Sequence, residues 1–333
     1  MQKNTVFMSY RPDVWCFAMD LLTDILRQAG LRHRVLDLLA LAPAQALRFP
    51  CDKSLGLHVA LQGPVYIHSP GRAAPLALQS GDIAIMARGH DHVVATDAKV
   101  EKRRIATIVD RPTGSARPLA PAGSARLISG AYQFWNAPIH PFLATLPDWF
   151  VLRGAELPRL GSVALTVGLI GEEAANARPG AQTILHGLLD VLFAYLMREI
   201  ASRNAETGPG LGKAFADAHV KQAIALMHTD YARGWTLETL AEAVGLSRTR
   251  LAERFRVAMD DTPLAYLRTV RMQAAMRLLS ETEKKLDDVA AQVGYQDAFG
   301  FSKVFKRTVG VAPKEFRRRD TAERASPWRL TAS

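Results

Sequence analysis

Cysteine is almost absent from this chain. Only Cys16 and Cys51 occur among the 333 residues. No mark of export accompanies them, because residues 1–11 are polar and no apolar segment follows. A secreted, disulfide-based fold is therefore not expected. We expect both cysteines to be reduced and structural, and the protein to be cytoplasmic.

Long apolar runs are missing as well. The best candidate for a membrane span, residues 184–197, contains His186 and Asp190 and is shorter than the roughly 20 residues that a spanning helix needs. We therefore expect no membrane partner.

Acidic residues are in the minority. The 42 Lys and Arg exceed the 32 Asp and Glu, which leaves a net charge of +10. A positive chain favours a polyanionic partner, although charge alone is weak evidence. The length, with a hydrophobic content of 48%, predicts two domains with two cores.

The C-terminal part of the chain carries one pattern twice. The segment Leu240–Leu246 (LAEAVGL) returns as Val289–Tyr295 (VAAQVGY). Three further residues return fifty positions later, Leu251, Phe255 and Pro263 as Phe301, Phe305 and Pro313. This spacing predicts a duplicated helix-turn-helix.

Each copy has the local signals of that motif. A short helix ends at Gly245 or Gly294, where glycine can take the left-handed conformation of a tight turn. The second helix then begins at an N-cap residue, Ser247 or Asp297. Its apolar residues recur at i and i+4 and face one way.

The opposite face of each second helix is basic. It carries Arg248, Arg250, Arg254 and Arg256 in the first copy and Lys303, Lys306 and Arg307 in the second. Such a helix suits the DNA major groove, where phosphates attract it and base edges can be read. The alternative is a pair of ordinary core helices with solvated charged faces.

The segment between the copies favours the DNA interpretation. It opens with Thr262-Pro263, an N-cap followed by a residue preferred at the first helical position, and runs to about Ser280 with one apolar face. Nineteen residues form a helix of roughly 28 Å. Successive major-groove faces lie roughly 34 Å apart. The spacer would hold both recognition helices on one side of the duplex.

The residues 235–319 resemble the DNA-binding domain of the AraC/XylS family of bacterial transcription regulators, down to the run Phe301-Ser302-Lys303-Val304-Phe305-Lys306-Arg307. The resemblance implies base-reading positions at Thr249, Ala252 and Glu253 in the first copy and at Ala298, Phe299, Ser302 and Lys303 in the second. Together with Arg248, Arg250, Arg256, Lys306 and Arg307 they form the predicted DNA-binding set. Double-stranded DNA, RNA polymerase and a second copy of the chain are the implied partners.

Two residues depart from the family pattern. Asp260 stands where the second copy has Gly310, and aspartate tolerates the left-handed conformation better than most residues. Glu253 occupies a position that is often basic or amide-bearing. It either accepts a hydrogen bond from a cytosine amino group or braces Arg256.

The first two-thirds of the chain alternate short Val-, Ile- and Leu-rich runs with turn residues, which predicts a sandwich or barrel. The expected strands are residues 55–61, 65–68, 83–86, 93–96, 102–109, 126–134 and 149–153, after a helix around residues 20–29. The segment Gly81–His92 is similar to the second signature of the cupin barrel, with Ala87 in place of its proline. Residues 20–203 thus resemble the cupin sensor domain that precedes AraC-type DNA-binding domains.

A cupin enzyme would need a metal, commonly held by histidines and a carboxylate. Here the first signature offers only His58, without a His-x-His pair or an acid four residues later, while His90 and His92 could share a strand face. We therefore expect no metal, no cofactor and no catalysis. A metal-dependent cupin enzyme fused to a DNA-binding domain is the alternative, and a ligand-free architectural DNA binder is another.

A barrel without catalytic ligands keeps a cavity that suits a small-molecule effector. The predicted effector-binding residues are His58, Tyr66, Arg88, His92 and Tyr132, with Trp15, His68, Phe134 and Trp135 as further candidates. The Pro-, Gly- and Ser-rich residues 111–126 read as a loop.

The predicted fold class is α+β multidomain, a cupin-like β-barrel followed by an all-α double helix-turn-helix. The expected divisions are a sensor over residues 1–180, a dimerisation helix and linker over 181–212, the DNA-binding domain over 213–320 and a tail over 321–333. The helix over residues 181–203 has two adjoining apolar stripes, and we expect Leu185, Leu189, Leu192 and Leu196 to pack against a second copy. Whether the regulator acts as an activator or a repressor depends on where its DNA site lies relative to the polymerase.

Overall fold

The computed structural model describes residues 21–28, 32–51, 54–101, 105–108, 123–133, 139–176, 178–203 and 209–323. Trp15, Cys16, Phe134, Trp135, most of the 111–126 loop and the tail from residue 324 lie outside the described residues. In the part of the chain that is described, no helix is both long and apolar enough to cross a membrane.

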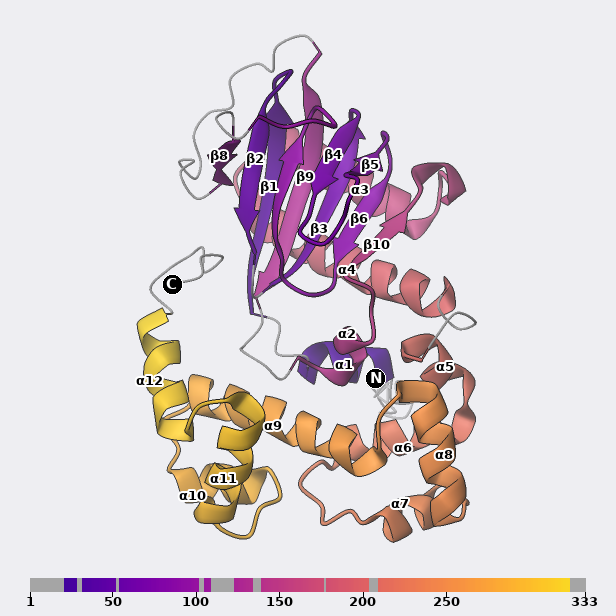
Figure 1. The fold of residues 1–333 in the computed structure, drawn as a ribbon, viewed down its shortest axis with the longest axis vertical. Helices are drawn as coiled ribbons and strands as arrows, with labels where there is room; N and C mark the ends of the chain where they lie inside the picture. Colours follow the sequence, from indigo (N-terminus) through magenta and orange to yellow (C-terminus); the bar gives the residue numbers. More distant parts are fainter. Residues whose placement is uncertain are drawn as a thin grey trace, which may run out of the picture.

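Two five-stranded sheets form the N-terminal domain (Figure 1). One contains, in spatial order, β1 (Arg32–Leu41), β9 (Ala125–Gln133), β3 (Ser54–Gln62), β6 (Ile83–Met86) and β10 (Trp149–Leu152). The other contains β5 (Leu76–Leu78), β4 (Val65–His68), β7 (Asp91–Ala95), β2 (Ala46–Pro50) and β8 (Ile105–Thr107). Neighbouring strands are antiparallel except for β2 and β8. All seven predicted strands are found, some of them with shifted ends, and β1, β2 and β5 are added to them. Residues 102–104, 109 and 134 of the predicted strands lie outside the described residues.

The first sheet is apolar on both faces. Along β3 and β9, successive side chains point to opposite sides. Ala60 and Leu127 belong to the core between the two sheets. Val59 and Ile128 belong to a second core on the other face. A sheet of this kind needs cover on both sides.

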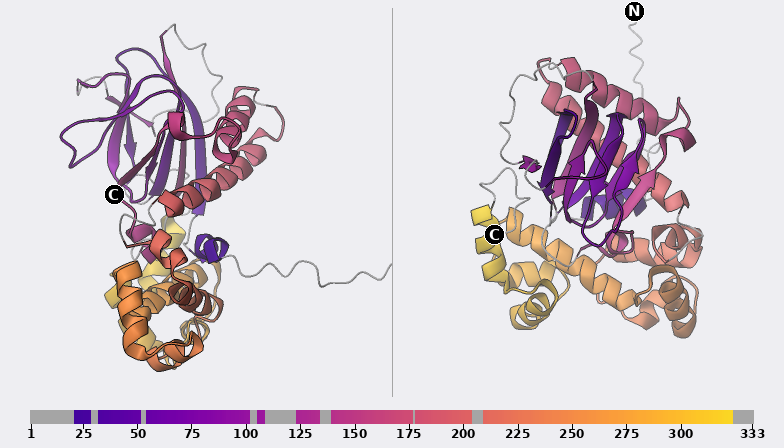
Figure 2. Two further views of the ribbon diagram at one scale, coloured as in Figure 1. Left: turned by 90° about the vertical axis from the view of Figure 1, so that its right-hand side faces the viewer. Right: turned by 45° about the horizontal axis from the view of Figure 1, so that its top comes forward.

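Two antiparallel helices, α3 (Ser162–Asn176) and α4 (Ala181–Arg203), cover the outer face of this sheet (Figure 2). Leu189, Leu192 and Leu196 of α4 are fully buried within a single chain. Leu189 packs on the β9 backbone, because a Cβ added at Gly130 would lie 2.8 Å from its Cδ1 atom. The prediction that Leu189, Leu192 and Leu196 form a dimer interface is therefore wrong. These leucines close the core of their own domain. Leu185, the fourth residue of the predicted set, is half-buried and packs against the same core.

The C-terminal domain is entirely helical. It comprises α5 (Leu211–Ala216), α6 (Ala218–Thr229), α7 (Leu237–Ala243), α8 (Arg248–Met259), α9 (Pro263–Glu281), α10 (Leu286–Gln292), α11 (Ala298–Val309) and α12 (Pro313–Glu323). The duplicated helix-turn-helix is confirmed as α7–α8 and α10–α11, and the predicted spacer is α9.

The predicted local signals act as expected. Ser247 accepts a hydrogen bond from the Arg250 backbone N–H at 3.3 Å, and Asp297 accepts one from Gly300 at 2.7 Å. Gly245 and Gly294 have φ angles of +71° and +80°. Each tight turn therefore uses the left-handed conformation that its glycine permits.

The long helix α9 contributes to two cores. Its first half places Tyr266 and Val270 in the core that also contains α6 and α8. Its second half places Met276 and Leu279 in the core formed with α10, α11 and α12. Each helix-turn-helix is thus packed on one half of a single rigid helix.

The short helices α1 (Leu21–Gln28) and α2 (Pro141–Ala144) lie between the sheets and the C-terminal helices (Figure 1). Helix α1 packs on α6 and α9. Its residues Leu21 and Ile25 are buried in the same continuous core as Leu192 of α4 and Ile224 of α6. One apolar core therefore links the sheet domain to the first helix-turn-helix.

Asp260, the C-cap of α8, has φ 53° and ψ 27°, the left-handed conformation that Gly310 takes at the end of α11. Its side chain is exposed, and no hydrogen bond or ion pair of that side chain occurs among the described residues. We expect Asp260→Gly to be neutral or to raise the free energy of unfolding by up to about 1 kcal/mol, because glycine removes backbone strain. Thermal or urea denaturation measures this change. Gly310→Ala is the matched control and should be destabilising, and a clear loss of stability in Asp260→Gly would contradict the explanation.

Candidate DNA-binding surface and sensor cavity

The two recognition helices present equivalent stripes. Fifty positions separate Thr249, Ala252, Glu253 and Arg256 of α8 from Phe299, Ser302, Lys303 and Lys306 of α11. On the opposite faces Leu251, Phe255, Phe301 and Phe305 are fully buried. The helices lie toward opposite ends of α9 (Figure 1). Most residues of the predicted DNA-binding set are exposed, and Ala252, Ala298 and Ser302 are half-buried.

Some basic residues of α8 have partners within the chain. Arg254 is half-buried and pairs with Asp217, the N-cap of α6, at 3.2 Å. The prediction of a DNA-facing Arg254 is thus corrected, because this side chain braces α8 against α6. Arg248 pairs with Glu238 of α7, but both side chains are largely exposed. Such a surface pair contributes little stability, so Arg248 remains able to exchange Glu238 for a phosphate.

No ion pair between Glu253 and Arg256 occurs among the described residues. The interpretation that Glu253 braces Arg256 is therefore not supported. In the second copy, Lys303, Lys306 and Arg307 are exposed and make no ion pair with any described carboxylate. The positive charges of the second stripe are therefore not neutralised by any described carboxylate.

A small cavity lies between the two sheets of the N-terminal domain. Its volume is about 20 Å³, room for about one water molecule. It is lined by Asp37, Phe49, Cys51, Gly56, His58, Met86, His92, Ser129, Gly130 and Ala131. An effector can enter this arrangement only if the surrounding side chains move.

A chain of hydrogen bonds runs through the cavity wall. His92 Nδ1 lies 2.8 Å from the His90 carbonyl oxygen, which only accepts, so Nδ1–H donates and Nε2 is left as an acceptor. His58 Nε2 lies 2.8 Å from His92 Nε2 and must therefore carry the proton of this hydrogen bond. The Ser129 hydroxyl, 2.8 Å from His58 Nδ1, donates to it. Both imidazoles are neutral and fully paired.

Burial explains the neutral state. It lowers the pKa of His58 well below its usual value, and the neighbouring His92 lowers it further. Burial also lowers the pKa of His92 to about 4. The rings pack among aromatic side chains, with Phe49 stacked on His92 at 5.2 Å and Trp149 edge-on at 5.1 Å.

The residues around this pair do not fit a cupin metal. Asp37 and Cys51 also line the cavity, but no three His, Cys, Asp or Glu side chains among the described residues converge as metal ligands. The Nε2 lone pair that His92 would offer a metal already accepts the His58 proton.

Only two of the five predicted effector-binding residues meet at the cavity. His58 and His92 line it, whereas Tyr132 lies on the other face of β9, packs against Phe193 of α4 in a tilted arrangement and donates to Asp190 at 2.9 Å. Tyr66 is half-buried on β4 and alternates with the inward-facing Val65 and Ile67. The prediction that Tyr66 and Tyr132 line the cavity together with the histidines is therefore wrong. The period-two alternation of strands sends them to other surfaces.

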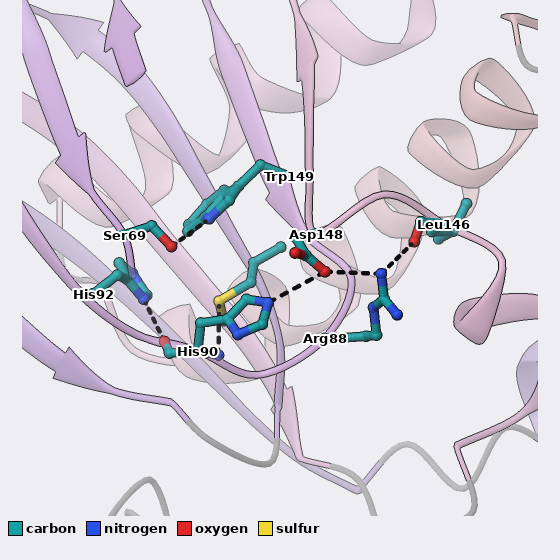
Figure 3. Close-up of polar contacts among 8 residues, drawn as sticks. Ser69, Arg88, His90, His92, Leu146, Asp148 and Trp149 are labelled. Atoms are coloured by element: carbon teal, nitrogen blue, oxygen red, sulfur yellow. Dashed lines mark hydrogen bonds and ion pairs between the residues drawn. The ribbon is translucent and has the colours of Figure 1, made fainter. Parts of the chain in front are cut away.

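Arg88 follows β6 and is not among the residues that line the cavity. Figure 3 shows its side chain pointing toward Asp148 and the Leu146 carbonyl. It pairs with Asp148 at 2.8 Å and donates to the Leu146 carbonyl at 3.3 Å. His90 Nε2 lies 3.4 Å from the same carboxylate, while the His90 carbonyl accepts the bond from His92. The loop that follows β6 therefore connects the cavity histidine to residues 146–148.

Residues 139–147 also touch the C-terminal domain. With Arg88, this segment forms one wall of a groove of about 650 Å³, and Pro209, Met259, Asp260 and Asp261 form the other. The buried His140 lies 5.4 Å from the His228 ring of α6, and His228 bonds to the Tyr266 hydroxyl of α9 at 2.8 Å. No sequence pattern pointed to Ser129, Asp148 or His140, because their partners are distant in the chain.

Comparison with known proteins finds the same two regions. Residues 20–202 match a family model described as cupin, and residues 240–319 match one described as a helix-turn-helix domain. The chain is 26% identical over 304 residues to a protein of Streptomyces lividans described as an AraC-like transcription regulator, covering 91% of this chain and 99% of that protein. It is 27% identical over 280 residues to the HTH-type transcriptional regulator AlkR of Acinetobacter baylyi, covering 82% of this chain and 90% of that one. Among solved structures, the DNA-binding domain of AdpA in complex with a target DNA is 28% identical and covers 31% of this chain and 94% of that chain, with a TM-score of 0.30.

The depressed pKa of His92 predicts a pH dependence of stability. Unfolded histidine titrates near 6.5, so the folded state loses stability as the pH falls below that value and until the folded pKa of about 4 is reached. At pH 5 the loss due to this group is about 2 kcal/mol. We expect His92→Gln, which cannot titrate, to reduce the decline between pH 7 and pH 5 in chemical denaturation by about that amount. An equally steep decline in the variant would contradict a buried, neutral His92.

Proposed function

Since this chain belongs to the AraC family of helix-turn-helix transcription regulators and carries an N-terminal cupin domain, we propose that it is an effector-responsive regulator whose recognition helices read two successive major-groove segments. The relatives named above are described as transcription regulators, not as enzymes. The proposal places its action in the bacterial cytoplasm, with RNA polymerase as a further partner.

The observation that carries the DNA-reading proposal is the pair of equivalent stripes on α8 and α11. Each stripe stands opposite a fully buried apolar face, so each helix can be presented to DNA without loss of core packing. The 19 residues of α9 set the helices on a rigid support, and at about 1.5 Å per residue its length approaches the spacing of successive major-groove faces.

The sensing proposal is supported by a continuous path of contacts. A ligand that separates His58 from His92 would alter the His92–His90 bond and the loop that carries Arg88. Arg88 holds the Leu146 carbonyl, and Leu146 lies in the wall of the groove that faces Met259 and Asp260 at the end of α8. Such a ligand would favour one arrangement of the domains over another and so change the population that can bind DNA.

Dimerisation is proposed for a different surface from the one expected from sequence. The outer face of the α3–α4 hairpin exposes Leu165, Leu169, Ile184 and Val191, each about half exposed. Leu165 and Leu169 are one turn apart on α3, and Ile184 and Val191 are two turns apart on α4. Large apolar side chains exposed together on one helical hairpin favour an interface there. The occupant proposed is a second copy of the chain.

The DNA-reading proposal predicts the salt dependence of binding. Lys306→Ala removes an exposed charge from the second stripe and should weaken binding similarly on every sequence, lowering the slope of log affinity against log salt by about one. Filter-binding or anisotropy titrations at several salt concentrations measure this slope. Lys99→Ala, at an exposed lysine of the sheet domain, is the matched control. A footprint with a single protected groove segment per protomer would overturn the two-segment arrangement.

The dimer proposal predicts different effects for the two faces of the hairpin. Leu165→Glu with Val191→Glu should convert a dimer to a monomer in sedimentation velocity while leaving the melting temperature nearly unchanged, because both side chains are already partly solvated. Leu189→Glu should instead destabilise the fold by several kcal/mol, because it places a charge in a closed core. A dimer that survives the double substitution would exclude this face as the interface.

A further inference from the structure

Phe299 is the exception among the aromatic residues of the C-terminal domain. Its side chain is 83% exposed, whereas Phe255, Phe301 and Phe305 are fully buried and Phe316 nearly so. Burying a phenylalanine side chain stabilises a fold, because apolar surface is removed from water. An exposed phenylalanine therefore adds nothing to the stability of the domain. An exposed apolar side chain does not by itself identify a binding surface, since Leu160 is 85% exposed as well. The position of Phe299 beside the basic residues of α11 is therefore what points to a partner.

The geometry of α11 places Phe299 on the stripe that is proposed to face DNA. Phe299 lies in the first turn of α11, two residues after the N-cap Asp297. Lys303 and Lys306 follow at i+4 and i+7 and share its face, opposite Phe301 and Phe305. Any approach that brings these lysines to DNA therefore brings Phe299 with them. In helix-turn-helix proteins the N-terminal residues of the recognition helix meet base edges.

The chemistry of the side chain narrows the target further. Phenylalanine has no hydrogen-bonding group, so it cannot read the donors and acceptors of a base edge. The apolar group that the major groove presents is the C5-methyl of thymine. We propose that Phe299 specifies thymine at one position of the half-site read by α11, by apolar contact with that methyl group. This inference rests on the proposed reading of two groove segments.

The first copy reads differently at the equivalent place. Thr249 occupies the position fifty residues earlier and carries a hydroxyl beside its methyl group. Glu253 in the first copy likewise corresponds to Lys303 in the second. The two half-sites are therefore not repeats of one sequence, and the dependence on a thymine methyl belongs to the α11 half alone.

The test uses the full-length protein and duplexes selected by it from a random library. Each thymine in the α11 half-site is replaced in turn by deoxyuridine, which removes only the C5-methyl. We expect one position at which the affinity of the unmodified protein falls about threefold to fivefold, the effect of exposing one buried methyl. Phe299→Ala should bind the thymine duplex more weakly and show no further loss with deoxyuridine at that position.

The control is Leu160→Ala, at an apolar side chain that is 85% exposed in the sheet domain and lies far from α11 in the chain. It should keep the full dependence on the methyl group. Phe299→Ala should fold normally, because the side chain is exposed and alanine favours helix. Circular dichroism melting checks this point.

Three results would overturn the inference. One is an undiminished deoxyuridine effect in Phe299→Ala, which would assign the methyl contact to another residue. Another is no sensitivity to deoxyuridine at any position. The third is unchanged DNA affinity with loss of transcription, which would assign Phe299 to a protein partner. In each case footprints that still cover two segments would leave the proposed function standing, whereas a single protected segment would overturn that function itself.

Discussion

A sheet that is apolar on both faces is the constraint on which the rest of this structure depends. The second sheet closes one face of the β1–β9–β3 layer, and the α3–α4 hairpin must close the other. Because Leu189, Leu192 and Leu196 are used for that closure, they are not available to bind another chain. The same core continues through α1 into the first helix-turn-helix, so the sheet domain and the DNA-binding domain share apolar packing.

Buried, hydrogen-bonded polar groups lie at two places, inside the sheet domain and at its junction with the helical domain. His58 and His92 satisfy each other inside the sheets, and His228 and Tyr266 do so beside His140 at the junction of the domains. Burial lowers the pKa of His140 well below its usual value and that of His228 to about 4. Neutral, paired groups of this kind hold one arrangement firmly, because breaking a buried hydrogen bond leaves a costly unsatisfied atom. Under the proposed sensing function, a ligand that changes this arrangement has to supply new hydrogen-bond partners for these groups.

The duplicated domain separates scaffold from recognition. The recognition-helix caps and the glycine turns of the two copies are equivalent, the buried pair Leu251 and Phe255 corresponds to Phe301 and Phe305, and each half of α9 packs in one of the two cores. The two stripes carry different residues at every position. Thr249, Ala252, Glu253 and Arg256 of the first copy correspond to Phe299, Ser302, Lys303 and Lys306 of the second. The exposed positions of these stripes can vary at little cost to the fold, so the proposed reading of two different half-sites needs no change of scaffold.

The sequence by itself determined the helix-turn-helix repeat, its caps and the left-handed turn at Asp260, because these depend on residues within a few positions of one another. It also indicated seven of the strands through their apolar runs, whereas β1, with Arg32, Arg34 and Asp37 in its run, and α3, with Gly168 and Gly171, lacked a clear local pattern. Only the tertiary structure decided which α4 stripe is buried, that Tyr132 turns away from His58, and that Arg254 pairs with Asp217. Each of those results depends on which face of an element meets a partner distant in the chain, and periodicity defines faces without saying what will cover them.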